Sequence, residues 1–187
     1  MAIMAKSSGD GQSFQPAPAG MYQAVCVDVV DLGVLKTTWQ GVEKSQRKIN
    51  VAWQIAEDRD DGKPFLVFKR YTLSLHEKSA LRKDLESWRG KPFTRDEEMG
   101  FDVEAVLGVN CLLNIVHRPV GEKVYANVQN VNPLMKGMAP MHARDYVRKV
   151  ERTPEQHAAS QVNGSGSHDM EEPPPLTDDD FEDSVPF

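Results

Sequence analysis

Hydrophobic and polar positions alternate through much of the first half of the chain, which is the pattern of half-buried β-strands. The clearest example is residues 48–55, whose alternate positions on one face are Ile49, Val51, Trp53 and Ile55. Residues 21–35 are rich in β-branched side chains and predict a long strand that bends near Leu32 and Gly33. Because Trp53 shares its face with aliphatic residues, we expect its ring to lie in the core.

A third strand is predicted at residues 64–75, after an Asp61-Gly62 turn that makes a hairpin with the second strand. Its two faces carry different sets: Phe65, Val67, Lys69, Tyr71 and Leu73 on one, and Leu66, Phe68, Arg70 and Thr72 on the other. If the first set packs into the core, Phe68 and Arg70 face a groove, and Lys69 extends along the surface or sits at a bulge. The pattern alone leaves open which face is buried.

The periodicity changes to that of helices after this strand. Residues 74–77, which begin with Ser74 and end with Glu77, have the spacing of a capping box. An apolar stripe then predicts an amphipathic helix that ends at Gly90, and its members are Leu81, Leu85 and Trp88.

A second capping box, from Thr94 to Glu97, predicts a short helix before Gly100, and residues 101–108 predict another helical turn or two. Strand patterns return at residues 109–117 and 123–131, on either side of a turn, and predict a second hairpin.

Five strands with a helical insertion between the third and fourth predict a mainly β protein, a five-stranded Greek-key barrel of the OB type. An α+β sheet with a helix packed on one face fits the same order of elements. We expect a flexible N-terminal arm at residues 1–18 and the folded domain at residues 19–150. A linker without a fold at residues 151–177 and an acidic segment at residues 178–187 complete the chain, so both ends are expected to be disordered.

The net charge of -6 is unevenly distributed along the chain. From Asp169 onward there are eight carboxylates and no Lys or Arg, whereas residues 1–168 carry a net charge of +2. A mildly basic body with an acidic tail is a pattern found in nucleic-acid-binding proteins. No run of about 18 apolar residues and no signal peptide is present, so we expect a cytoplasmic protein without membrane association.

Cys26 and Cys111 lie far apart in strand-like sequence, and we expect two buried free thiols. A zinc site would need further ligands that the sequence does not cluster, and we expect no cofactor.

Basic and aromatic residues are interleaved on the first three strands, which is the mixture that single-stranded nucleic acid requires. Unpaired bases stack on flat rings, at roughly 1–3 kcal/mol per base, and cations follow the phosphates. Trp39 lies in a polar stretch, residues 37–46, that reads as a loop with no core for an indole to join. The candidate binding residues are Lys36, Trp39, Lys44, Arg47, Lys48, Phe68, Lys69, Arg70, Tyr71 and Tyr125.

Catalysis has less support in the sequence. One alternative is a Mg²⁺-dependent nuclease or recombination enzyme whose carboxylates would be Glu57, Asp58, Asp60 and Asp61. These residues precede Gly62 in a hairpin loop, where turn geometry by itself favours aspartate. The histidines lack metal-binding spacing, and no nucleotide-binding or hydrolase motif is present, so we expect no enzymatic activity. A protein–protein adaptor is a further alternative.

The ending DDDFEDSVPF, which follows a linker containing Pro, Gly and Gln, resembles the end of bacterial single-stranded DNA-binding proteins. The body instead resembles phage-encoded proteins of that functional class over roughly residues 18–150, through stretches such as PAGMYQAVCVDVVDLG and NCLLNIVH. The resemblance implies an OB-fold that coats single-stranded DNA during phage DNA replication or recombination, in the cytoplasm of the host cell. It also implies a tail that docks onto partner enzymes. The oligomeric state of the bacterial family does not carry over, because the body differs.

The tail has a physical reason for its form. An aromatic residue can enter an apolar pocket on a partner while the carboxylates contact a basic rim. The same charge could fold back onto the basic body, or serve only solubility. Phe181 and Ser184 interrupt the pattern of the bacterial tails. The candidate docking residues are Asp178, Asp179, Asp180, Phe181, Asp183, Pro186 and Phe187.

Overall fold

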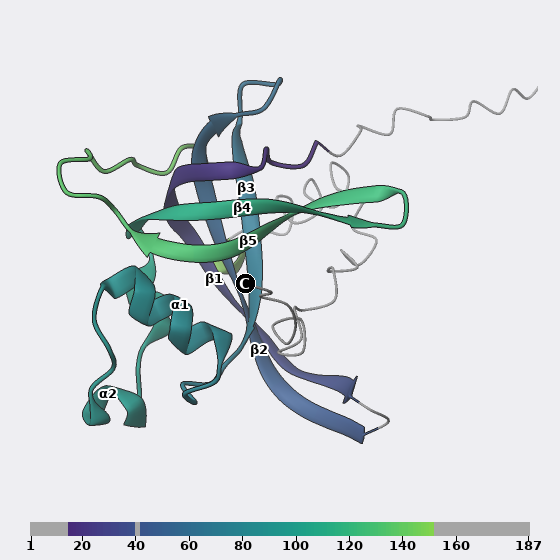
Figure 1. Cartoon of the computed structure of the whole chain (residues 1–187), viewed down its shortest axis with the longest axis vertical. Coiled ribbons are helices and arrows are strands. Elements are labelled where there is room, and N and C mark those ends of the chain that lie inside the picture. Colours follow the sequence, from purple (N-terminus) through teal and green to yellow (C-terminus); the bar gives the residue numbers. More distant parts are fainter. Residues whose placement is uncertain (1–14, 40–41, 152–187) are drawn as a thin grey trace, which may run out of the picture.

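The structure is a computed structural model that describes residues 15–39 and 42–151. Its centre is one antiparallel sheet of five strands in the order β3-β2-β1-β4-β5 (Figure 1). The strands are β1 (Gly20–Trp39), β2 (Val42–Asp58), β3 (Pro64–Thr72), β4 (Asn110–Val120) and β5 (Lys123–Pro133). The mainly β, five-stranded fold predicted from the alternating pattern is confirmed.

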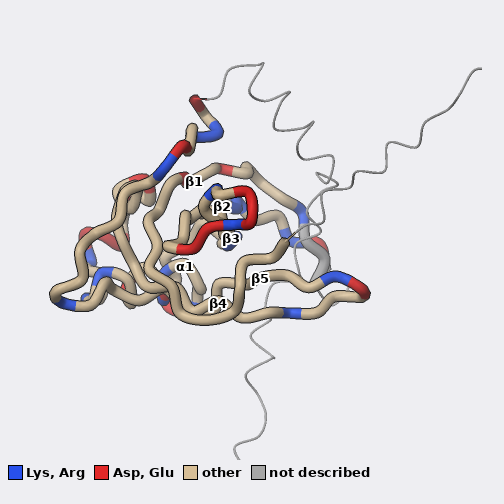
Figure 2. The backbone as a smooth tube through the Cα atoms, turned by 90° about the horizontal axis from the view of Figure 1, so that it is seen from above, with Lys and Arg blue, Asp and Glu red and all other residues tan. Residues whose placement is uncertain are grey.

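The sheet curls strongly, so that β3 and β5, which are last in the strand order, come into contact (Figure 2). The Lys69 ammonium on β3 donates a hydrogen bond of 3.1 Å to the carbonyl of Gln129 on β5. No ladder of backbone hydrogen bonds joins these two strands in the described part of the chain. The described part of the chain therefore forms a curled five-stranded sheet that is not closed into the expected barrel.

The helical insertion lies between β3 and β4 as predicted, and contains α1 (Ala80–Arg89), α2 (Arg95–Met99) and the 3₁₀ turn η1 (Val103–Val106). Helix α1 packs on the sheet through the predicted stripe, Leu81, Leu85 and Trp88, all of which are buried.

The predicted ends of these helices are partly right. Helix α1 begins at the cap Ser79, whose hydroxyl accepts from the Arg82 N–H at 3.2 Å, so the start predicted from Ser74 is wrong. Gly90 ends it in the left-handed conformation, with φ of 68°. The capping box of α2 is confirmed, because the Thr94 and Glu97 side chains each bond to the other's backbone N–H.

The main core lies between the inner face of the sheet and α1. Trp53 is only 1% exposed, as predicted, and its ring centroid is 6.0 Å from that of Trp88 on α1. On β3, Phe65 and Val67 are buried, whereas Phe68 is exposed. The open question about the two faces of β3 is thus answered, because the face that includes Phe65 packs into the core.

Strands β1 and β2 continue past the sheet as a two-stranded hairpin, which we call the arm (residues 33–39 and 42–48; lower right in Figure 1). The loop predicted at residues 37–46 is therefore wrong, because backbone pairing continues to Trp39 and Val42. The predicted bend is present as a shift in register between Asp31 and Gly33, where Gly33 has a φ of 71°.

An irregular segment follows β5 and crosses the other face of the sheet. We call residues 139–151 the strap; it includes the 3₁₀ turn η2 (Lys149–Glu151). Two buried polar side chains hold it. Gln54 bonds to both backbone groups of Arg144, at 2.8 Å and 2.6 Å, and the Asp28 carboxylate accepts from the Lys149 N–H at 2.7 Å.

Both ends of the chain are described only in part. Of the expected N-terminal arm, residues 15–18 are described; there Ala17 is buried and its carbonyl accepts a 2.8 Å hydrogen bond from His117. The expected linker beyond residue 151 and the acidic docking residues at 178–187 lie outside the described residues. In the part of the chain that the structure describes, none of the helices has the length and apolar character needed to cross a membrane.

Candidate nucleic-acid interface

The side of β2 and β3 that points away from the main core carries a mixed aromatic and cationic surface. In register, Lys48 pairs with Thr72, Asn50 with Arg70 and Ala52 with Phe68. Leu66 and Phe68 are each 37% exposed, although both are large and apolar. We call this surface the outer face, and its members are Lys48, Asn50, Ala52, Leu66, Phe68 and Arg70.

Three of the predicted binding residues meet on this outer face. Phe68 and Arg70 are two positions apart on β3, so their side chains leave the same side of the strand. Lys48 lies on the adjacent strand β2, one pair further along the same side. Phe68 and Arg70 are therefore near neighbours, whereas Lys48 is diagonal to Arg70 and four positions along the strands from Phe68, roughly 13 Å at about 3.3 Å per residue.

Lys69 and Tyr71 point to the opposite side of β3, under α1. The Tyr71 hydroxyl donates to the Asp84 carboxylate at 2.7 Å, and the Lys69 ammonium bonds to the same oxygen at 2.7 Å. Burial, reinforced by the negative charge of Asp84, raises the pKa of Tyr71 well above its usual value. A ring that is 3% exposed offers no face to a base, so Tyr71 belongs to the core and Lys69 to its polar edge.

The arm carries the remaining predicted cations. Arg47 donates to Asp31 at 3.1 Å, and this hydrogen bond lowers the pKa of the Asp31 carboxyl group. Lys36 lies 3.6 Å from Glu43, and both side chains are largely exposed. Such exposed pairs stabilise little and exchange readily for other charges. Phosphates could therefore replace these carboxylates.

The two other arm candidates are Lys44 and Trp39. Lys44 is exposed on β2. Trp39 is the last residue of β1 and pairs with Val42, while its side chain lies outside the described part.

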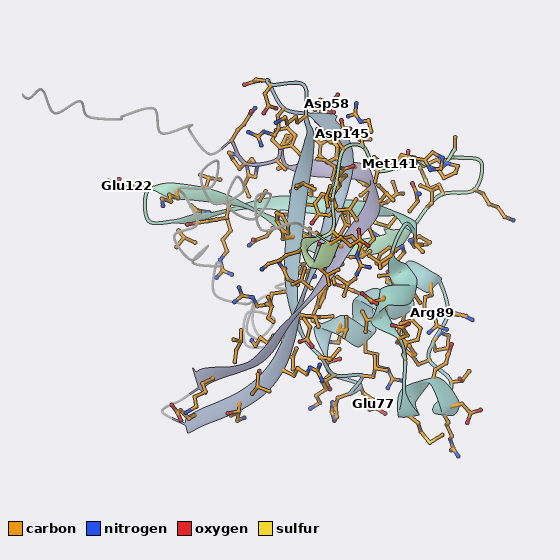
Figure 3. All side chains as sticks on the ribbon, turned by 180° about the vertical axis from the view of Figure 1, so that it is seen from behind. Asp58, Glu77, Arg89, Glu122, Met141 and Asp145 are labelled. Carbon is orange, nitrogen blue, oxygen red and sulfur yellow. The ribbon has the colours of Figure 1, made fainter. Side chains whose placement is uncertain are left out.

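Tyr125 is separate from the outer face. It is half-buried on β5, directly opposite Arg118 of β4, close to the turn that joins these strands. This β4–β5 hairpin and the arm project on the same side of the molecule (Figures 1 and 3).

The four acidic residues proposed for magnesium do not form a metal site. They lie at the end of β2 and in the loop to β3, which is a nearly continuous acidic stretch of the backbone (Figure 2). Asp58 pairs with Arg144 of the strap, and Asp61 accepts from the Lys63 N–H at 3.2 Å within the turn. Among the described residues, no three His, Cys, Asp or Glu side chains are grouped so that they could hold a metal ion.

Both cysteines are buried, as predicted. Burial raises the pKa of Cys26 to about 12 and raises the pKa of Cys111 even further. The thiolate is the reactive form of cysteine, so neither residue has the character of a nucleophile near neutral pH.

Tyr146 on the strap was not among the residues predicted from the sequence. This residue packs against the outer side of β1 and β2, and its hydroxyl donates to Asp28 at 3.0 Å. The strap has no regular periodicity, and the only available signal was its composition, an aromatic residue among the cations of ARDYVRKV.

Comparisons with known proteins supply no family for this chain. No family model matches it, and a search of curated proteins finds no match. Its function is therefore inferred from its own residues and their arrangement.

Proposed function

We propose that this protein binds single-stranded DNA without sequence preference, through the outer face of β2 and β3 together with the arm. In this role it would coat single strands during DNA replication or recombination, in keeping with the resemblance of its sequence to phage proteins of that class.

The observation that carries the proposal is the exposure of Phe68 beside Arg70, with Lys48 further along the same face. Phe68 is 37% exposed and lies two positions from Arg70 on the same side of β3, so it offers apolar surface beside a cation. An exposed ring that is flanked by cations suits an unpaired base with its phosphates. Double-stranded DNA does not present its bases in this way, which favours single strands.

The strand order gives independent support. We propose that the curled sheet is an OB-type Greek-key barrel, with β3 beside β5 and the helical insertion between β3 and β4. In such barrels the face of strands 2 and 3, together with the loops between strands 1 and 2 and between strands 4 and 5, binds oligonucleotides. Here those positions correspond to the outer face, the arm and the β4–β5 hairpin.

We also propose that the acidic segment recruits replication or recombination proteins. Phe181 and Phe187 would enter apolar pockets on a partner, and the neighbouring carboxylates would contact its basic residues. Deleting residues 178–187 should abolish capture of such partners and leave the affinity for oligo(dT) at least as high as before. Partner capture that survives the deletion would remove this part of the proposal.

Binding is best measured by the anisotropy of a labelled oligo(dT), because Trp53 and Trp88 are 1% and 7% exposed and report poorly on a surface ligand. Phe68→Ala should weaken binding by roughly 1–3 kcal/mol. Arg70→Ala should lower the slope of log affinity against log salt by about 0.7, the value for one phosphate contact on a single strand.

Met99→Ala is the matched control, because Met99 is an 83% exposed apolar residue on α2 and lies outside the outer face. It should bind like the unmodified protein. If the unmodified protein does not retain oligo(dT) at low salt or at physiological salt, the binding proposal is wrong and the adaptor alternative is favoured. Cleavage of the DNA in the presence of Mg²⁺ that is lost in Asp58→Ala would instead favour the nuclease.

A further inference from the structure

The strap places a second aromatic ring next to the outer face. Tyr146 and Met141 pack against a small cluster formed by Val25, Val27 and Ala52, on the side of β1 and β2 that points away from the main core. Tyr146 is half-buried there rather than enclosed.

Register brings this ring close to Phe68. Ala52, one member of the cluster against which Tyr146 packs, is directly opposite Phe68 on the neighbouring strand. Ala52 has the smallest side chain of the outer face and is only 2% exposed, so the side chains around it cover it. Neighbouring strands are about 4.8 Å apart, so the two rings lie on the same side of the sheet at roughly one or two strand spacings.

Tyr146 is held in position by buried polar contacts. Its hydroxyl donates at 3.0 Å to Asp28, which is 1% exposed and also accepts from the Lys149 N–H at 2.7 Å. The preceding residue, Asp145, has a φ of 51°, a left-handed conformation that turns the chain where the ring enters. Figure 3 shows Met141 and Asp145 near Asp58, at the end of β2.

The strap is anchored mainly by its backbone. Gln54 bonds to the N–H and the carbonyl of Arg144, and Asn110 bonds to both backbone groups of Met141, at 2.8 Å and 3.0 Å. A substitution at Tyr146 leaves all of these bonds in place. The ring can therefore be changed without removing the contacts that hold the strap.

We propose that Tyr146 and Phe68 form a two-ring platform on which neighbouring unpaired bases stack. The strap is then a fixed part of the binding surface, and it supplies a ring next to the cluster of Val25, Val27 and Ala52, which has none of its own. This inference rests on the proposed function, because it names a second residue of the same surface.

The test compares two substitutions by anisotropy with labelled oligo(dT). Tyr146→Leu keeps an apolar side chain against the cluster of Val25, Val27 and Ala52 but removes the ring, and should weaken binding roughly 5- to 150-fold, the equivalent of one stacked base. Tyr146→Phe keeps the ring but loses the hydrogen bond to Asp28, so its loss should be much smaller than that of Tyr146→Leu. Because both variants lose that hydrogen bond, the difference between them isolates the ring.

A second measurement observes stacking directly. In a Trp39→Phe background, Tyr146→Trp adds an indole at the proposed platform, while the two native indoles that remain are buried in the core. Oligo(dT) should quench the fluorescence of the added indole. The control is the Trp39→Phe protein that keeps Tyr146, and its fluorescence should change little. This readout also covers the case in which Tyr146→Leu folds poorly.

The outcomes separate this inference from the proposed function. If oligo(dT) binds and depends on Phe68, but Tyr146→Leu binds as tightly as Tyr146→Phe, the platform is wrong while the function stands. Absence of quenching in Tyr146→Trp at saturating oligo(dT) would equally overturn it. If the unmodified protein does not bind oligo(dT), the proposed function fails first, and the platform fails with it.

Discussion

Asp28 and Gln54 show how single buried polar residues determine the position of a whole segment. They are the two buried polar side chains among the described residues, and both make hydrogen bonds to the strap. A buried carboxylate without partners is costly, so its donors must stay in place for the fold to be stable. These donors come from residues about 120 positions later in the chain, which is why the sequence around Asp28 did not indicate its burial.

Cys26 and Cys111 give a prediction about pH at the residue scale. Burial raises the pKa of Cys26 to about 12 and that of Cys111 further, whereas thiols in an unfolded chain titrate near pH 8.5. Between these values the unfolded chain has released protons that the folded protein retains. Stability should therefore be unaffected by the thiols below about pH 8 and should fall above it, by up to about 1.4 kcal/mol per pH unit for each thiol.

The measurement is urea unfolding under reducing conditions at several pH values between 8 and 10, an interval chosen to span the thiol titration. The control is a Cys26→Ala/Cys111→Ala protein, in which other alkaline groups such as Tyr71 are unchanged. Its stability should fall less steeply with pH than that of the unmodified protein, whatever its absolute value. Equal slopes would show that the thiols do not contribute to the alkaline loss.

At the scale of elements, the start of α1 can be tested with two serines. The Ser79 hydroxyl caps the helix by accepting from the Arg82 N–H, whereas the Ser74 hydroxyl accepts from the His76 N–H in the preceding turn. Replacing a capping serine by alanine costs about 1 kcal/mol. Ser79→Ala should therefore lower the free energy of unfolding by about that amount, measured from the urea midpoint at unchanged slope.

Ser74→Ala is the matched control and should cost clearly less, because no helix depends on that hydroxyl. A larger loss for Ser74→Ala than for Ser79→Ala would contradict the assigned cap. The two variants thus decide between the start indicated by the sequence and the start found in the structure.

Elements with a local repeating pattern could be predicted from the sequence. The stripe of α1 and the alternation of residues 48–55 each repeat along one face of one element, and the capping box at Thr94 is a motif of four consecutive residues. The arm beyond residue 35 was missed because alternation marks a strand where one face is buried, and each face of the arm mixes apolar with polar residues. The strap was missed because irregular backbone has no period.

The candidate site could be predicted only in part, for a related reason. Phe68, Arg70 and Lys48 follow from strand alternation once the buried face of β3 is known. That face is selected by long-range partners, such as Asp84 for Tyr71, and no pattern within β3 reveals them. Tyr146 joins the surface through contacts with strands more than 90 positions earlier in the chain.

At the scale of the whole molecule, Asp84 and Lys69 together connect α1, β3 and β5. From α1 it bonds to Lys69 and Tyr71 of β3, and Lys69 also reaches the carbonyl of Gln129 on β5. These contacts hold together the two strands that backbone pairing leaves unjoined. Asp84→Ala leaves an enclosed cation and a buried hydroxyl without their acceptor.

Breaking a fully buried pair costs about 3–5 kcal/mol. The side chains of Lys69 and Asp84 retain 20% and 16% exposure, so we expect a smaller loss. Asp84→Ala should lower the free energy of unfolding by about 2 kcal/mol in urea titrations. Adding Lys69→Met should recover part of that loss, because no unpaired ammonium remains. A double variant that is less stable than Asp84→Ala would contradict this view of the contact.

The continuity of β1 and β2 from the sheet into the arm has a mechanical consequence. Because the same two strands form both parts, the arm is a stiff extension of the sheet that is fixed at one end. The backbone hydrogen bonds between β1 and β2 resist stretching of the arm along the strand direction. The shift in register at Gly33, with the Asp31–Arg47 ion pair beside it, marks the base at which bending is easiest. Tension applied at the tip would thus rotate the arm about this base before it disturbed the packing of Trp53.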